Sequence, residues 1–258
     1  MLPSRNEYVV ARLAAIKSAV AAARPPQHKA ESRADESATL FRQQGFVRMD
    51  ALVKGEVLSE LIETFARAQH RARIEWQRAR RAQEGWAAQG YFDIPSALSE
   101  MPALLALLEQ PRLVALLQEV IGPQVTLIHV QARTVLPESE GGDYFGLHRD
   151  TARSASGLSS GLPDHPSQSE HVKLFVALNR HSQRNGATSV VGGTHRIQTN
   201  LSEERPISYP GMQVFDGRSG DAMLMDLRTI HGALPNRSKS ETREGLVRVA
   251  AAAHTIHT

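Results

Sequence analysis

The chain has 258 residues, enough for one large domain, and its 41% hydrophobic and 22% charged residues are ordinary for a globular protein. It contains no cysteine, which excludes disulfides, thiolate metal sites and cysteine nucleophiles and is compatible with a cytoplasmic location. The net charge is only +3, so the chain as a whole shows no strong bias toward a polyanionic partner.

The N-terminal segment has helical periodicity. Residues 6–24 are rich in alanine but interrupted by Arg12 and Lys17, so an amphipathic helix is expected there instead of a signal peptide. Residues 28–37 are polar and predict a linker, so that residues 1–37 form a helical extension. No stretch of the chain is long and apolar enough to predict a membrane span.

Further helices are predicted before the middle of the chain. A short helix is expected to end at Gly45 before a short strand, and residues 54–83 predict a long amphipathic helix. Residues 96–122 predict a pair of helices divided near Pro111. These helices carry apolar stripes, which must be buried against another part of the protein.

A run of arginines lies between residues 71 and 83 of the long predicted helix. A nucleic-acid surface is one interpretation of such a run. Glu75 and Glu84 lie within and beside it, and we identify no aromatic platform with it. A solvated helix face is therefore favoured, and no nucleic-acid partner is expected.

The second half has a different pattern, with short apolar or alternating runs separated by turn clusters. These runs lie at residues 124–136, 171–179, 188–193, 221–227 and 245–254. Many short strands with glycine-rich turns indicate an antiparallel barrel or sandwich. We expect residues 1–258 to form a single domain, mainly β with flanking α, whose N-terminal helices cover a sheet.

One long segment has neither pattern. Residues 151–170 are rich in Ser, Gly and Pro, and loops of this length in compact domains are usually functional or disordered. They follow Asp150 directly, so we expect a mobile loop at the active site.

The most informative cluster is a His-x-Asp pair, His148 and Asp150, at the end of an apolar run. In extended structure residues two apart project from the same face. His231 ends another apolar run. Two imidazoles and a carboxylate form the facial triad of non-haem Fe(II) oxygenases, although a solvated polar pair at a strand end is the alternative. Arg243 or Arg248 in the last strand would offer a fork for a carboxylate.

The order of motifs resembles the phytanoyl-CoA dioxygenase family of Fe(II)/2-oxoglutarate oxygenases, which includes ectoine hydroxylases. The similar segments are "QQGFVRMD", "FGLHRD", "NGATSVVGGTH" and "GDAMLMDLRTIHGALPN", and the resemblance covers roughly residues 38–250. It implies a double-stranded β-helix, the jelly-roll or cupin-like fold, backed by helices.

The resemblance implies a role for five residues. His148, Asp150 and His231 match the iron ligands. Arg243 best matches the arginine that holds the distal carboxylate of 2-oxoglutarate, because it follows His231 by twelve positions and opens the last strand; Arg248 is the competing assignment.

Two further residues, Gln131 and Arg133, resemble the Gln-x-Arg that lines the substrate pocket in the ectoine hydroxylase branch. That branch carries a lysine where Leu136 stands and often a tryptophan before the first ligand, so ectoine itself is not the expected substrate. Asp150 fills the position that is small in related halogenases, which favours hydroxylation, desaturation or another oxidation over halogenation.

The implied activity uses Fe(II), 2-oxoglutarate and O2 and releases succinate and CO2 while oxidising a small-molecule substrate, most simply by hydroxylating a C–H bond. Two alternatives stay open: a cupin-type metal enzyme that does not use 2-oxoglutarate, and a non-catalytic ligand binder. The sequence predicts neither the substrate nor the oligomeric state.

The remaining polar candidates have structural interpretations. His195 is expected to stabilise the turn after a strand, and Asn236 to bond backbone in a turn. His129 is expected in the core or the pocket wall, and Lys173 either inside the barrel or at its rim. Solvated positions are expected for His165, His171 and His181.

Overall fold

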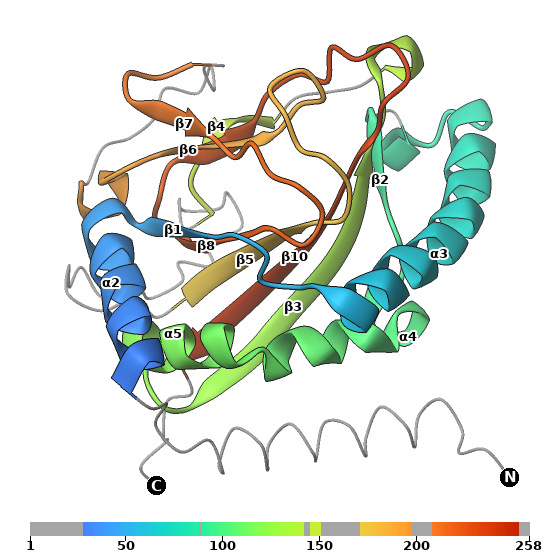
Figure 1. Cartoon of the computed structure of the whole chain (residues 1–258). Coiled ribbons are helices and arrows are strands. Elements are labelled where there is room, and N and C mark those ends of the chain that lie inside the picture. Colours follow the sequence, from blue (N-terminus) through green and yellow to red (C-terminus); the bar gives the residue numbers. More distant parts are fainter. Residues whose placement is uncertain (1–27, 88, 142–144, 151–170, 198–207, 253–258) are drawn as a thin grey trace, which may run out of the picture.

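The computed structural model describes residues 28–87, 89–141, 145–150, 171–197 and 208–252 (Figure 1). The helix expected over residues 6–24 and the loop expected over residues 151–170 lie outside these ranges. None of the described helices has both the length and the apolar composition needed to cross a membrane.

The described elements follow the predicted order of helices first and strands later. The α-helices are α2 (His28–Gln44), α3 (Gly55–Arg81), α4 (Ala97–Glu100) and α5 (Pro111–Ile121). The 3-10 segments are Gly85–Ala87, Pro102–Glu109, Glu138–Glu140 and Thr194–Arg196. The strands are β1 (Phe46–Met49), β2 (Tyr91–Asp93), β3 (Val125–Val135), β4 (Phe145–His148), β5 (His171–Ala177), β6 (Thr188–Val191), β7 (Met212–Val214), β8 (Ala222–Asp226), β9 (His231–Ala233) and β10 (Arg243–Ala252).

The strands form two antiparallel sheets that face one another. The larger sheet has the order β1-β8-β5-β10-β3-β2, and the smaller has the order β4-β9-β6-β7. Figure 1 shows the helices on the side of the larger sheet that faces away from the smaller one. This is the mainly β jelly-roll architecture, backed by helices, that the sequence predicts.

Alternation along the strands of the larger sheet separates a helix-facing side from an inner side. Val172 and Leu174 of β5 pack in the main core with the helices, whereas Phe175 packs with the smaller inner cluster of Val190, Phe215 and the β8 methionines. Successive side chains of a strand point to opposite faces, so Lys173 shares the inner face with Phe175. The space between the sheets is therefore lined by residues of both.

Two predicted boundaries in the helical half are wrong. Residues 28–37, expected as a linker, begin α2, because Lys, Ala, Glu and Arg are good helix formers even in a polar segment. The first of the two helices expected in residues 96–122 is instead the short α4 followed by a 3-10 segment. Pro102 explains the break, since the residue before a proline disfavours helical geometry and Met101 has φ −131° and ψ 71°.

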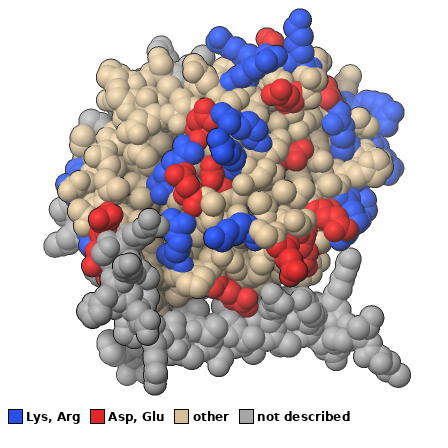
Figure 2. All heavy atoms as spheres, viewed as in Figure 1, with Lys and Arg blue, Asp and Glu red and all other residues tan. Residues whose placement is uncertain are grey.

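The arginine run of α3 makes contacts within the chain. Arg71 pairs with Glu100, and Arg73 pairs with Glu140. Contrary to expectation, an aromatic ring accompanies the run, because Arg80 lies 4.9 Å from the centroid of Trp76. Figure 2 shows positive and negative side chains interspersed over the visible face, as expected for a solvated surface.

Gly45 connects the end of α2 to the elements that carry His231. It has φ +76°, and its carbonyl accepts hydrogen bonds from the Asp226 amide at 2.8 Å and the Thr229 hydroxyl at 2.9 Å. A β-carbon at this position would collide with the Thr229 hydroxyl and with His195 Nδ1. Only glycine therefore satisfies both the left-handed backbone and the close approach.

We expect Gly45→Ala to lower the free energy of unfolding by about 3 kcal/mol, because left-handed strain and overpacking add together. Gly193→Ala is the matched control: Gly193 has φ +78°, but a β-carbon there meets no atom within 4 Å, so only the strain of about 1–2 kcal/mol applies. Urea unfolding of the two variants measures the difference. Equal losses would contradict the proposed collision.

Candidate metal centre

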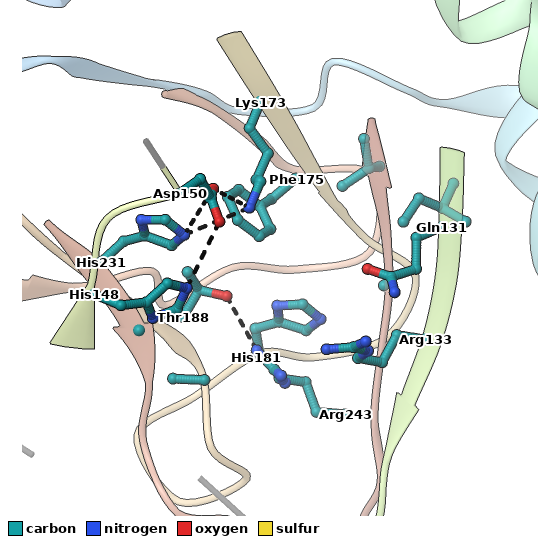
Figure 3. A pocket seen from close by; sticks show the side chains of 15 residues that line it. Gln131, Arg133, His148, Asp150, Lys173, Phe175, His181, Thr188, His231 and Arg243 are labelled. Carbon is teal, nitrogen blue, oxygen red and sulfur yellow. Dashed lines mark hydrogen bonds and ion pairs between the residues drawn. The ribbon is translucent and has the colours of Figure 1, made fainter. Parts of the chain in front are cut away.

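Strand pairing brings the two candidate histidine ligands together. His148 ends β4 and His231 begins β9, and the two are direct register partners in the smaller sheet. Cross-strand partners share a face, which explains why their ring centroids lie 4.5 Å apart. Asp150 follows two residues after His148, and one ligand atom from each of the three residues lies within 4.8 Å of the others (Figure 3).

Backbone carbonyls fix the orientation of both imidazoles. His148 Nδ1 lies 2.8 Å from the Gly146 carbonyl, and His231 Nδ1 lies 3.0 Å from the Thr229 carbonyl. A carbonyl only accepts, so each Nδ1 carries the proton and donates it. Both Nε2 atoms are then left with lone pairs for a metal, the arrangement usual for metal-binding histidines.

The spacing of the donor atoms suits a single divalent ion. Asp150 oxygens lie 3.7 Å from His148 Nε2 and 3.4 Å from His231 Nε2. Adjacent ligands around an ion with bonds of about 2.1 Å would be roughly 3 Å apart. The two imidazoles and the carboxylate can therefore meet one ion after small side-chain movements, and their donor set is that of a facial Fe(II) site.

Electrostatics keep these groups in their metal-binding forms. Burial, together with the charge of Lys173, which outweighs that of Asp150, lowers the pKa of His231 to about 3, so the imidazole is neutral at neutral pH. Burial alone would raise the pKa of Asp150, but its interactions with His231 and with the Lys173 ammonium outweigh burial and hold that pKa below its ordinary value. The carboxylate is therefore ionised.

Lys173 projects from β5 toward the triad. Its ammonium pairs with Asp150 and lies 3.5 Å from His231 Nε2. The sequence leaves open whether Lys173 lies inside the barrel or at its rim, and the structure places it inside.

The triad opens onto a cavity of about 250 Å³ between the two sheets. Arg243, the first residue of β10, lies at the opposite end of this cavity (Figure 3). Its guanidinium donates to the Thr188 hydroxyl at 3.0 Å, and it has no carboxylate partner among the described residues. Burial, together with the charge of Arg133, lowers the pKa of Arg243 to about 10, so it remains a cation at neutral pH.

Gln131 and Arg133, for which the sequence predicts a place in the substrate pocket, line the same cavity from β3. Asp93 of β2, which the sequence analysis missed, holds both of them. It accepts from Gln131 at 2.7 Å and takes a two-pronged bond from Arg133 at 2.7 and 2.8 Å. A lone aspartate in a three-residue strand gives no sequence signal. Only the β2–β3 register, which pairs Asp93 with Arg133, places it there.

The other candidates divide between expected and unexpected positions. Asn236 donates to the Glu241 carbonyl at 2.8 Å, as expected for a turn, whereas His195 has a structural contact with α2, through the Arg42 carbonyl at 3.0 Å. His129 is exposed on β3, so its predicted place in the core or pocket wall is wrong. The side chain of Arg248 and all of His165 lie outside the described part of the chain.

His181 is not solvated as predicted but buried in the cavity wall, 4% exposed. Its Nε2 donates to the Glu244 carbonyl at 2.8 Å, and its Nδ1 has no hydrogen-bond partner within the described part of the chain. Burial and the nearby charge of Arg243 lower the pKa of His181 to about 3. The folded state therefore favours the neutral imidazole.

This pKa shift predicts a dependence of stability on pH. Between about pH 6.5 and pH 3 the unfolded chain binds a proton at His181 that the folded chain does not, so stability falls as pH falls. His181→Gln, which keeps a donor toward Glu244, should reduce this slope by up to about 1.4 kcal/mol per pH unit. Urea unfolding at pH 7.5, 6 and 5 tests this, and identical slopes in variant and wild type would contradict it.

Comparisons with known proteins find similarity at the level of family and of fold. The family model described as phytanoyl-CoA dioxygenase (PhyH) matches residues 41–245. Dioxygenase aneA of Aspergillus aculeatus is 33% identical over 78 residues, which cover 29% of this chain and 25% of that protein. The match thus spans about a quarter of the length of that curated relative.

Two solved structures share the fold at low sequence identity. The epimerase SnoN, solved with Fe3+, alpha ketoglutarate and nogalamycin RO, has a TM-score of 0.60 and 19% identity over 86% of this chain and 85% of its own. HygX from Streptomyces hygroscopicus, solved with nickel and 2-oxoglutarate, has a TM-score of 0.60 and 19% identity over 84% of this chain and 86% of its own.

Proposed function

Since the chain belongs to the phytanoyl-CoA dioxygenase family, we propose that it is a non-haem Fe(II)- and 2-oxoglutarate-dependent dioxygenase that hydroxylates a C–H bond of a small molecule. The observation that carries this proposal is the pairing of His148 and His231 across two strands, with both Nε2 atoms turned toward Asp150. Backbone carbonyls orient both imidazoles, and a solvated polar pair would need no such orientation.

The three side chains would hold the iron through one face. His148 and His231 supply neutral nitrogen donors, and Asp150 supplies a charged oxygen donor. Because the protein would supply only three of its ligands, the metal could also bind small molecules. Bound iron, with 2-oxoglutarate and O2, supplies the oxidising power that protein side chains lack.

Arg243 is positioned to hold the far carboxylate of 2-oxoglutarate. A buried cation without an acidic partner among the described residues is costly, and a carboxylate from the cosubstrate would relieve that cost. The guanidinium offers a planar fork, and the Thr188 hydroxyl adds one more polar group beside it. Arg248 remains the competing assignment.

Gln131 and Arg133 form the wall on which a substrate would rest. Asp93 fixes both side chains, so the wall is rigid before any ligand arrives. Rigid polar groups need no reordering when a ligand binds, which lowers the entropic cost of recognition.

The type of oxidation requires a product measurement, because SnoN, which shares the fold, is described as an epimerase. Hydroxylation adds one oxygen atom to the substrate, whereas epimerisation leaves its mass unchanged. The carboxylate of Asp150 occupies a ligand position, and this supports hydroxylation over halogenation.

The test is a substrate screen of the Fe(II)-loaded protein under oxygen, read by succinate formation and product mass. Succinate release that depends on both 2-oxoglutarate and Fe(II) supports the proposal. Turnover of a substrate without any 2-oxoglutarate would favour a cupin-type enzyme instead. Metal binding without product formation, and without succinate release in the absence of a substrate, would favour a ligand-binding protein.

A further inference from the structure

Lys173 is a charged residue of the cavity that the proposed binding of iron and 2-oxoglutarate does not use. It occupies an inner-face position of β5, and its side chain is 14% exposed. Figure 3 shows its ammonium pointing at the triad beside Phe175, whose ring centroid is 5.6 Å away. Within the described residues its one acidic partner is Asp150, which is also the proposed metal ligand.

The charges of the loaded site can be followed group by group. A divalent metal, the Asp150 carboxylate and doubly charged 2-oxoglutarate together carry one negative charge, which Arg243 compensates. The remaining arginine of the wall, Arg133, is compensated by Asp93. Once a metal takes up the charge of Asp150, Lys173 is the cation of the described cavity wall that would be left without a compensating charge.

An uncompensated ammonium in a partly buried cavity is costly, because desolvation removes the water that would stabilise it. From the placement of Lys173 beside the triad we infer that it binds a carboxylate of the primary substrate. A carboxylate brings one negative charge and matches one lysine, whereas a phosphate monoester would bring about two. This inference rests on the proposed function and adds the substrate class to it.

The location of Lys173 also bears on how the substrate lies. Its nitrogen is 3.5 Å from a metal-ligand atom, His231 Nε2, so a carboxylate held there lies beside the metal centre and not at a remote point of the cavity. Phe175 borders the same position and offers an apolar surface to the carbon atoms next to the carboxylate.

Binding of simple probes tests the inference without knowledge of the substrate. The protein is loaded with Fe(II) and saturating 2-oxoglutarate in the absence of oxygen and titrated calorimetrically with matched pairs: propionate against propanamide, and benzoate against benzamide. We expect wild type to bind at least one carboxylate about tenfold or more tighter than its amide. Lys173→Met should remove that preference, and Lys173→Arg should keep part of it.

Lys54→Met is the matched control, because Lys54 is exposed at the start of α3 and makes no capping hydrogen bond. It should bind the probes as wild type does. Both Lys173 variants are first shown to bind Fe(II) and 2-oxoglutarate, which separates this test from failure of the proposed function or of folding. Three results would each overturn the inference. Wild type could show no preference for carboxylates, Lys173→Met could keep the preference unchanged, or Lys173→Met could lose only the binding of 2-oxoglutarate.

Discussion

Replacing Asp150 with alanine should weaken metal binding by roughly a hundredfold or more and abolish Fe(II)-dependent succinate release. Even the loss of a group that only supports a ligand costs about 10–100-fold in metal affinity, so loss of a ligand itself should cost at least as much. The change also leaves the Lys173 ammonium facing His231 without the carboxylate that now compensates it. This ammonium would then repel a divalent cation.

The measurement is a metal titration in the absence of 2-oxoglutarate, followed by succinate release without primary substrate. Asp216→Ala is the control, because Asp216 forms an exposed ion pair with Arg180 at 2.6 Å, and exposed pairs contribute only about 0–1 kcal/mol. The control should match wild type in both measurements. If Asp150→Ala also matched wild type, His148 and Asp150 would be a polar pair at a strand end.

Much of the fold follows from local patterns. Alternation in β5, the apolar run of β8 and the glycine-rich turns predict the strands, and the apolar stripe of α3 predicts the helix that covers them. The polar start of α2 was misassigned because polarity alone does not distinguish a linker from a solvated helix. The break at Pro102 was missed because the apolar run continues through it.

Candidate site residues are predictable from the sequence where they are neighbours along the chain or where the order of motifs supplies them. His148 and Asp150 lie two residues apart, and the motif order supplied His231. Asp93 and His181 carry no such signal, because their positions depend on the β2–β3 register and on the packing of a turn against β10. Sequence patterns report faces and periods, whereas which buried charges compensate one another depends on the three-dimensional arrangement.

The second large effect is expected at the other end of the cavity. Arg243→Lys keeps a positive charge but loses the planar fork that matches a carboxylate, and lysine is shorter. We expect the dissociation constant for 2-oxoglutarate to rise about tenfold or more, which corresponds to about 1.4 kcal/mol. Arg243→Met, which removes the charge and keeps an apolar side chain in place, should weaken binding further. Metal affinity without 2-oxoglutarate should change little, because Arg243 does not contact the triad.

The same substitutions at Arg248 decide between the two arginines. Arg248→Met should leave the affinity for 2-oxoglutarate unchanged if Arg243 is the anchor, and the metal-loaded, oxygen-free protein allows that affinity to be measured by calorimetry. Arg243 lies in the cavity wall, bonded to Thr188 and without an acidic partner among the described residues, which is the physical reason to expect the larger loss there. A large loss in Arg248→Met with wild-type affinity in Arg243→Met would transfer the role to Arg248. Loss of metal binding in Arg243→Met would instead show that Arg243 supports the fold of the centre and not the cosubstrate.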